Sequence, residues 1–400
     1  MDLFNFLLFS LFFLCLGSLF IVFLGYPVFL YMVSIISPGK KECRPSQFTE
    51  DPSISLLVVF RNADSLIEKK IENYLALAYP RDKVELVLVS DGSTDGSDKI
   101  ARACESDTIQ FYQFDTHQGK TECLNFGVTK CKGQIILFSD VDAILDGAAL
   151  KILSQYFNDP KIGGVCGRRV VHENISKIQS GQLKYIQWDT MIKQLELRCG
   201  MSITSHDGKI YAIRKKLFTP VEPGVTDDAY ISLAIIGQGF KFVFNSDAIA
   251  WIKMPSRNTG HELTRRKRIV STSLNGLRIN RKLFNPFKFG LFSIGLFINK
   301  VMRRLLPFAL ILLLLSSCLL SFGNYPLVGL FFWCQVCGYL FFCAYPLLII
   351  RLPDRLKWIR RMKRFSSLGY FFCVGMAGTF LGVISFISGE KIIKWDPIKK

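Results

Sequence analysis

Two aspartates that follow an apolar run have the types and spacing to hold a metal ion. Asp140 and Asp142 come directly after the run Gly133–Ser139. In an extended segment, residues two positions apart face the same way, so both carboxylates could reach one cation. Mg²⁺ and Mn²⁺ prefer oxygen ligands and bridge diphosphates. A solvated loop that carries two acids is the structural alternative, and we favour the metal site.

A second acidic cluster combines carboxylates with hydroxyl groups. Asp91 and Asp95 lie in the segment DGSTDGS, directly after the apolar run Val84–Ser90. Acidic and hydroxyl groups at the end of a strand could hold a base or a ribose. The same residue types form turns and cap helices, so Asp95 or Ser97 capping the next helix is the structural alternative.

The third acidic pair, Asp227 and Asp228, precedes the apolar run Tyr230–Ile236. A carboxylate there could act as a general base, or it could simply favour the N-terminus of a helix. Lys120 stands in the segment HQGKT, between a predicted strand and a predicted helix. Its ammonium and nearby backbone N–H groups could contact phosphate, although the spacing of a P-loop is missing.

A dense basic run, Arg265–Arg268, precedes the most apolar part of the chain. Guanidinium geometry suits a diphosphate, and lipid headgroups are an equally weighted, compatible partner. The run lacks interleaved aromatic residues and a base-reading helix motif, which argues against nucleic acid. Residues 253–304 hold 13 Lys or Arg and one acid, and residues 351–366 hold seven and one, which accounts for the net charge of +18. We expect both stretches at the cytosolic membrane face.

The elements that must position these residues alternate between strand and helix patterns. Short apolar runs predict the strands, and helical spacing of apolar residues predicts the helices. Such alternation indicates a parallel α/β sheet, in which ligands bind at the carboxyl ends of the strands. The predicted strands are 54–60, 84–90, 109–114 and 133–139, and the predicted helices are 65–77, 97–104 and 119–130.

Long uncharged segments flank this α/β region. Leu3–Gly39 exceeds the roughly 20 residues that span a bilayer, so we predict a retained transmembrane helix. Leu305–Ile350, which Gly323–Pro326 divides in two, and Phe365–Gly389 predict three more spans. Phe289–Asn299 is too short to span and predicts a helix on the membrane surface. The expected parts are an N-terminal transmembrane helix (1–39), an α/β domain (40–284), an interfacial helix (285–304), three membrane segments (305–389) and a tail (390–400).

The order of these pieces resembles the membrane-bound family 2 glycosyltransferases, which include the cellulose, chitin and hyaluronan synthases. The resemblance runs from Ser53 to the tail. It implies a GT-A fold (α/β, Rossmann-like, with a mixed sheet), a nucleotide-diphosphate sugar donor, usually UDP-linked, and an inverting transfer that depends on Mg²⁺ or Mn²⁺. It rests on the order and spacing of Arg61-Asn62, Asp91–Asp95, Gly119-Lys120, Asp140–Asp142, Gly208–Arg214, Thr226–Asp228, Arg265–Arg268 and Lys394–Pro397.

The resemblance also implies roles for single residues. Asp91 would contact the nucleobase, and Lys120 would lie near the nucleotide. Asp142 would bind the metal at the diphosphate, while Asp140 would touch the donor ribose or sugar and serve as a second metal ligand. Asp228 would be the general base that deprotonates the acceptor hydroxyl. The other donor-binding residues would be Arg61, Asn62, Asp95, Arg265 and Arg268, the last at the leaving diphosphate.

One departure from the synthase pattern affects the expected product. Polymer-extruding members usually carry Gln-x-x-Arg-Trp, whereas this chain has Arg265-x-x-Arg268-Ile269, which looks like a large bacterial branch. We therefore expect a multi-pass enzyme of the bacterial inner membrane, with a cytoplasmic catalytic domain. It would glycosylate a glycan or lipid-linked acceptor for cell-surface polysaccharide or glycolipid, with membrane lipids as further partners. A processive β-linked polysaccharide synthase, a catalytically silent export scaffold and accessory export subunits stay open.

Overall fold

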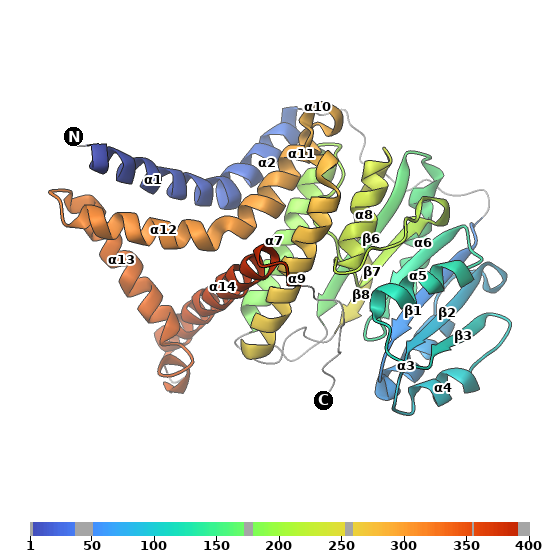
Figure 1. The fold of residues 1–400 in the computed structure, drawn as a ribbon. Helices are drawn as coiled ribbons and strands as arrows, with labels where there is room; N and C mark the ends of the chain where they lie inside the picture. The colour runs from blue at the N-terminus through green and yellow to red at the C-terminus, as the bar shows by residue number, and fades with distance from the viewer. Residues whose placement is uncertain (1–2, 37–50, 172–178, 253–258, 354–355, 391–400) are drawn as a thin grey trace.

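The computed structural model of the chain describes residues 3–36, 51–171, 179–252, 259–353 and 356–390. An α/β part occupies one side of the molecule, and long apolar helices extend from the other side (Figure 1). The tail motif 394–397 lies outside the described residues. The fold class expected from the sequence, an α/β domain joined to long apolar helices, is therefore confirmed.

A sheet of eight strands forms the centre of the α/β part. Its strands are β1 (Ile54–Phe60), β2 (Val84–Asp91), β3 (Ile109–Phe114), β4 (Ile135–Ser139), β5 (Ile144–Leu145), β6 (Ile162–Val171), β7 (Ile210–Arg214) and β8 (Lys241–Ile252). The spatial order is β3-β2-β1-β4-β7-β6-β8-β5. The first four strands in this order are parallel, and β7 runs antiparallel to both β4 and β6. The sheet is thus mixed, and its parallel half carries three of the predicted polar clusters at its carboxyl edge.

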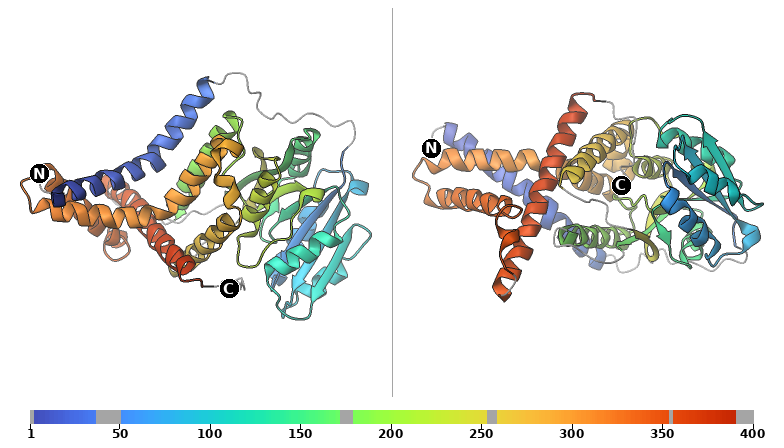
Figure 2. Two further views of the ribbon diagram at one scale, coloured as in Figure 1. Left: turned by 45° about the horizontal axis from the view of Figure 1, so that its top comes forward. Right: turned by 90° about the horizontal axis from the view of Figure 1, so that it is seen from below.

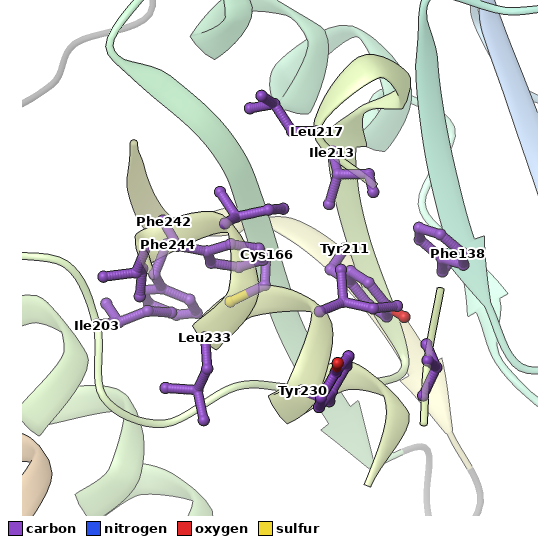
Figure 3. Packing of buried hydrophobic residues seen from close by; sticks show 14 of the residues in the cluster. Phe138, Cys166, Ile203, Tyr211, Ile213, Leu217, Tyr230, Leu233, Phe242 and Phe244 are labelled. Carbon is purple, nitrogen blue, oxygen red and sulfur yellow. The ribbon is translucent and has the colours of Figure 1, made fainter. Parts of the chain in front are cut away.

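Helices cover both faces of this sheet. They are α3 (Asp64–Leu75), α4 (Ser97–Ala103), α5 (Lys120–Lys130), α6 (Ala149–Ser154), α7 (Gln179–Arg198) and α8 (Asp227–Gly237), and α9 (Thr259–Ile279) packs on α8. Every residue of β1 is buried, as is typical of a parallel strand that is covered on both faces. Figure 3 shows part of the core on one face, where the rings of Phe138 and Tyr211 stack with centroids 4.7 Å apart.

Within the described part of the chain, four helical segments are long and apolar enough to cross a membrane: Leu3–Ile36, Leu291–Ser321, Pro326–Cys343 and Lys357–Ile387. They contain α1 (Leu3–Phe20), α2 (Tyr26–Ile36), α11 (Leu291–Leu296), α12 (Arg303–Ser321), α13 (Pro326–Cys343) and α14 (Lys357–Ile387), and α10 (Pro286–Phe289) precedes α11. The division that the sequence predicted at Gly323–Pro326 falls between α12 and α13. The segment predicted as an interfacial helix instead runs through a π-helical stretch, Phe297–Met302, directly into α12. Its position on a membrane surface stays a prediction.

Several contacts join these apolar helices to the α/β part, and two of them show how close the approach is. Helix α14 packs along α9, and both views in Figure 2 place them side by side. Glycine permits this close approach, because a Cβ atom at Gly382 would lie 2.6 Å from Cβ of Val270 and 2.9 Å from the carbonyl oxygen of Lys267. On the other side, the hydroxyl of Tyr26 in α2 donates to Glu196 of α7 at 2.7 Å. The apolar helices are thus in direct contact with the helices of the sheet domain.

Candidate active site

Asp140 leads directly out of β4 and meets the beginnings of two helices. Lys120, the first residue of α5, places its Nζ 3.1 Å from Oδ1 of Asp140 and 2.8 Å from Oδ2 of Asp227. Burial alone would lower the pKa of Lys120, but the two carboxylates outweigh it and hold that pKa above its usual value. A charged lysine therefore links the acidic pair after β4 to the acidic pair that begins α8.

A second lysine, Lys209, bridges Asp140 and Asp142. Its Nζ lies 2.9 Å from Oδ2 of Asp140 and 2.8 Å from Oδ1 of Asp142. Burial would raise the pKa of Asp140, but Lys120 and Lys209 hold it well below its usual range. Both aspartates thus face the same way, as their spacing predicts, and Asp140 is available as an anionic ligand.

The donor set of Asp140 and Asp142 fits a divalent cation. Their oxygens already converge on one cationic nitrogen, which is the arrangement that two carboxylate ligands of Mg²⁺ or Mn²⁺ require. Within the described residues, no group of three or more His, Cys, Asp or Glu side chains is placed to hold a metal. A cation here would therefore take its remaining ligands from a bound diphosphate and water, as Mg²⁺ commonly does.

A fully buried lysine fixes this segment from beneath. Lys70 of α3 donates to Oγ of Ser139 at 2.7 Å and to the carbonyl oxygen of Ala143 at 2.6 Å. Burial lowers the pKa of Lys70 to about 7, against the opposing effect of Asp140 and Asp142. Because Lys70 bonds to Ser139 and Ala143, which flank the segment with Asp140 and Asp142, it fixes the position of the two carboxylates.

Asp228, the expected base, lies in the first turn of α8. Its Oδ1 accepts from the backbone N–H of Ala229 at 2.7 Å. Burial, followed by the negative charge of Asp227, raises the pKa of Asp228 to about 6. A carboxylate with a pKa near neutrality is suited to accept a proton. Gly208 makes room for it, because a Cβ atom there would lie 2.8 Å from Oδ2 of Asp228.

Asp91 organises the loop that begins α5. It accepts from Nδ1 of His117 at 2.8 Å and from the backbone N–H groups of Gln118 at 2.7 Å and Gly119 at 3.1 Å. Gly119 has a φ of 103°, a conformation that favours glycine. Asp91 therefore positions the residue before Lys120, and its expected contact with a nucleobase stays a prediction.

Asp95 bonds to the first residue of the next helix, although the N-cap residue of α4 is Gly96 and not Asp95 or Ser97. Its carboxylate accepts from the backbone N–H of Ser97 at 3.0 Å and from that of Asp64 at 3.1 Å. These hydrogen bonds lower its pKa, although burial acts the other way. Asp95 thus ties the start of α4 to the start of α3. Any additional contact between Asp95 and a donor stays a prediction.

Arg61 and Asn62 follow β1 and lie beside the polar segment that follows β2. Oδ1 of Asn62 accepts from the backbone N–H of Thr94 at 2.8 Å, and the Asn62 N–H donates to Oγ of Ser93 at 3.1 Å. Asn62 has a φ of 49°, which asparagine tolerates better than most residues. The carboxyl ends of β1 and β2 are therefore joined at the edge where the acidic clusters lie.

The basic run lies on α9, and its members face different partners. Arg265 and Arg266 both bond to Glu262. Arg268 lies near the acidic cluster: burial and Arg265 lower its pKa, while the carboxylates of Asp227 and Asp140 act to raise it. The structure thus brings Arg268 together with the predicted donor-site acids, whereas Arg265 is paired within its own helix.

A pocket at this edge of the sheet is lined by two of the predicted site residues, Lys120 and Asp140, together with Asp227. Its polar lining comes from Lys120, Ser139, Asp140, Gly208, Tyr211 and Asp227, and its apolar lining from Leu57, Val59, Leu124 and Phe138. Acids, a lysine and an apolar floor at the ends of parallel strands can bind a polar, negatively charged ligand and its counter-cation.

Sequence reasoning missed the roles of Lys70 and Lys209. Lys70 occupies a position on the buried face of α3, between Ile67 and Tyr74, so a lysine at an apolar position of the helical period was the available signal. Lys209 directly precedes β7, and its closeness to Asp140 depends on antiparallel pairing with β4. The local sequence carries no signal for that pairing.

Comparisons with known proteins identify the family. The family model described as glycosyltransferase like family 2 matches residues 52–271. The chain is 24% identical over 221 residues to the probable glycosyltransferase YdaM of Bacillus subtilis (strain 168), a match that covers 52% of each chain. It is 24% identical over 209 residues to the O-antigen chain rhamnosyltransferase RfbN of Salmonella typhimurium, covering 49% of this chain and 65% of that protein. The chain thus spans about half the length of the first of these curated relatives, and somewhat more of the second.

A solved structure shares the fold over nearly the whole chain. Mannosyltransferase PcManGT from Pyrobaculum calidifontis, in complex with GDP-Man and Mn²⁺, superposes with a TM-score of 0.69 at 18% sequence identity. The similarity covers 95% of this chain and 99% of that one, so the GT-A-like sheet and the apolar helices share one architecture. Because the family model also matches more than half of the sequence, the chain belongs to glycosyltransferase like family 2.

Proposed function

We propose that this family 2 glycosyltransferase is an inverting, metal-dependent enzyme that uses a nucleotide-diphosphate sugar. The observation that carries the proposal is the convergence of Asp140 and Asp142 on one cationic nitrogen, beside the base candidate Asp228. A metal-ligand pair and a carboxylate of raised pKa at the same strand edge are what a transfer between a diphosphate sugar and a hydroxyl needs.

In the proposed mechanism, the charged side chains of the site bind the cation, stabilise the leaving group or accept a proton. A divalent cation held by Asp140 and Asp142 would supply Lewis-acid stabilisation of the diphosphate. Lys120 and Arg268 would offset the negative charge that grows on the departing diphosphate. Asp228 would take the proton of the acceptor hydroxyl at Oδ2, since Oδ1 already accepts from the backbone N–H of Ala229. Attack on the face opposite to the leaving group inverts the sugar carbon, and no covalent intermediate is needed.

The relatives support a cell-envelope product. One is named an O-antigen chain rhamnosyltransferase. Another, from Nostoc sp. (strain PCC 7120), is a β-monoglucosyldiacylglycerol synthase, 26% identical over 159 residues that cover 39% of this chain and 34% of that protein. We propose a glycan or lipid-linked acceptor at the cytoplasmic face of a bacterial inner membrane, where the basic stretches 253–304 and 351–366 would meet anionic headgroups.

The test measures nucleotide release by the full chain in detergent. UDP- and GDP-sugars are offered with Mn²⁺, with Mg²⁺ and with a chelator. Asp228→Asn should lower kcat by about 10²–10⁴, the contribution typical of a general base, and Asp142→Ala should remove the metal dependence. Asp107→Asn, which changes an exposed acid, is the matched control and should behave like the wild type. Full turnover by Asp228→Asn would refute the assigned mechanism.

Product length separates a single transfer from processive synthesis. We propose a single transfer, because Ile269 replaces the Trp that the polymer-extruding members of the family usually carry. Labelled product is sized on a gel after incubation with excess donor. A ladder of long products would show processive synthesis instead, while the site chemistry proposed above would stand.

A further inference from the structure

Lys209 occupies the position between two carboxylates that the proposed metal would use. Its Nζ lies 2.9 Å from Oδ2 of Asp140, and 2.8 Å and 3.2 Å from the two oxygens of Asp142. Lys120 differs, because it touches Asp140 at 3.1 Å and shares its charge with Asp227. Lys209 is therefore the lysine that neutralises the Asp140–Asp142 pair as a unit.

The sheet itself places Lys209 there. The antiparallel pairing of β4 with β7 ends with Ser139 opposite Ile210, and Asp140 and Lys209 are the residues that adjoin this last pair. Oγ of Ser139 bonds to the carbonyl oxygen of Lys209 at 3.1 Å, and Lys70 holds the same hydroxyl at 2.7 Å. The backbone of Lys209 is thus fixed relative to the aspartates, and its side chain is only 22% exposed.

An ammonium and a divalent cation cannot both occupy this position. They carry charges of the same sign and would use the same carboxylate oxygens, so the metal must displace the ammonium. The displaced ammonium would lose two carboxylate partners in a partly buried site, which is costly unless another anion replaces them. A diphosphate at the metal supplies that anion.

Resting on the proposed metal and donor site, we propose that Lys209 is the resident cation of the Asp140–Asp142 pair. A divalent metal replaces it more readily when a nucleoside diphosphate is bound, because the phosphate oxygens then receive the ammonium. The fold thereby couples metal binding to nucleotide binding. Because such coupling is reciprocal, each ligand must strengthen the other by the same factor.

The experiment measures Mn²⁺ affinity of the full chain in detergent by the electron paramagnetic resonance signal of free Mn²⁺. Titrations are run without nucleotide, with UDP and with GDP. In the wild type, one of the nucleotides should tighten Mn²⁺ binding about tenfold or more. Lys209→Met should bind Mn²⁺ about tenfold more tightly than the wild type without nucleotide, and nucleotide should then add little.

Three further variants serve as controls. Lys120→Met removes an equal charge beside Asp140 but leaves the bridge between Asp140 and Asp142, so the coupling should persist. Lys209→Arg keeps the charge and should also retain the coupling. Asp142→Ala should abolish Mn²⁺ binding in every condition. If Lys209→Met melts at a lower temperature than the wild type, Lys209→Gln replaces it.

The outcomes separate this inference from the proposed function. Equal Mn²⁺ affinity of wild type and Lys209→Met without nucleotide, or undiminished coupling in Lys209→Met, would overturn the role of Lys209 while the metal site stood. Binding of Mn²⁺ that survives Asp142→Ala would place the metal elsewhere and overturn both. Absence of Mn²⁺ binding in every variant, with nucleotide bound by calorimetry, would also overturn both.

Discussion

Asp227 and Lys120 form one ion pair beside the base candidate, and they act on Asp228 in opposite directions. Their charged atoms lie 2.8 Å apart. The negative charge of Asp227 raises the pKa of Asp228, and the positive charge of Lys120 lowers it. Replacing either partner breaks the same ion pair. Asp227→Asn and Lys120→Met should therefore move the pKa of Asp228 in opposite directions.

The size of the effect follows from the pKa of Asp228. Burial and Asp227 together raise that pKa from 3.8 to about 6, which corresponds to about 3 kcal/mol in favour of the protonated carboxyl. Two like charges at close range in a partly solvated site contribute roughly 1–4 kcal/mol. We therefore expect Asp227→Asn to lower the pKa of Asp228 by about one pH unit, or about 1.4 kcal/mol.

The assay is the pH profile of kcat/KM for nucleotide release. Because the base must be deprotonated, the rate in the wild type should fall about tenfold for each pH unit below 6. The acid limb should shift to lower pH in Asp227→Asn and to higher pH in Lys120→Met. If the acid limbs of the two variants moved in the same direction, the electrostatic reasoning would be refuted, because the shift would then report only the loss of the ion pair. An acid limb that persists in Asp228→Asn would assign the titration to another group.

Three further predictions concern the residues that position the site. Lys70 has a pKa of about 7 in the fold and 10.5 when unfolded, so the unfolded chain binds more protons between these values. Wild-type melting temperature should therefore rise from pH 7 to pH 9, whereas that of Lys70→Met should rise less. Gly208→Ala places a Cβ atom against Oδ2 of Asp228 and should lower kcat more than tenfold with little change in KM, because the base is displaced. Gly382→Ala should lower the free energy of unfolding by about 1–3 kcal/mol, and with it the melting temperature, because α14 must move away from α9. Gly338→Ala, with open space around it, should leave the melting temperature unchanged.

The parallel half of the sheet could be predicted because its signals are local. The runs 54–60 and 109–114 coincide with β1 and β3, and β2 extends only one residue past its run, to Asp91. Parallel strands buried on both faces have nearly continuous apolar sequences, which are easily recognised. The polar residues just beyond them were then placed correctly at one edge.

The family resemblance implied a mixed sheet, but the strands β5 to β8 were not predicted from local patterns, for a physical reason. Strand β6 reads IGGVCGRRVV, in which three glycines and two arginines interrupt the apolar run. Neighbouring elements leave no space for a Cβ atom at these glycines: at Gly164 it would lie 2.3 Å from the ring of Phe242, and at Gly167 it would meet the carbonyl oxygen of Ala248. Pairing between β4 and β7 joins Ser139 to Ile210, far apart in sequence, so the contact of Lys209 with Asp140 exists only in the folded chain.

The packing of α14 on α9 means that the linear domain boundaries do not mark units that can be separated. The helix that carries Arg268 has the sheet domain on one side and α14 on the other. Excising residues 40–284 would expose the apolar side of α9 and remove the Tyr26 partner of Glu196. Inactivity of such a fragment would therefore report that α9 has lost its packing partner, and would carry no information about the donor or the acceptor. Donor screening belongs with the intact chain, and a detergent that loosens the apolar helices should impair catalysis before the sheet unfolds.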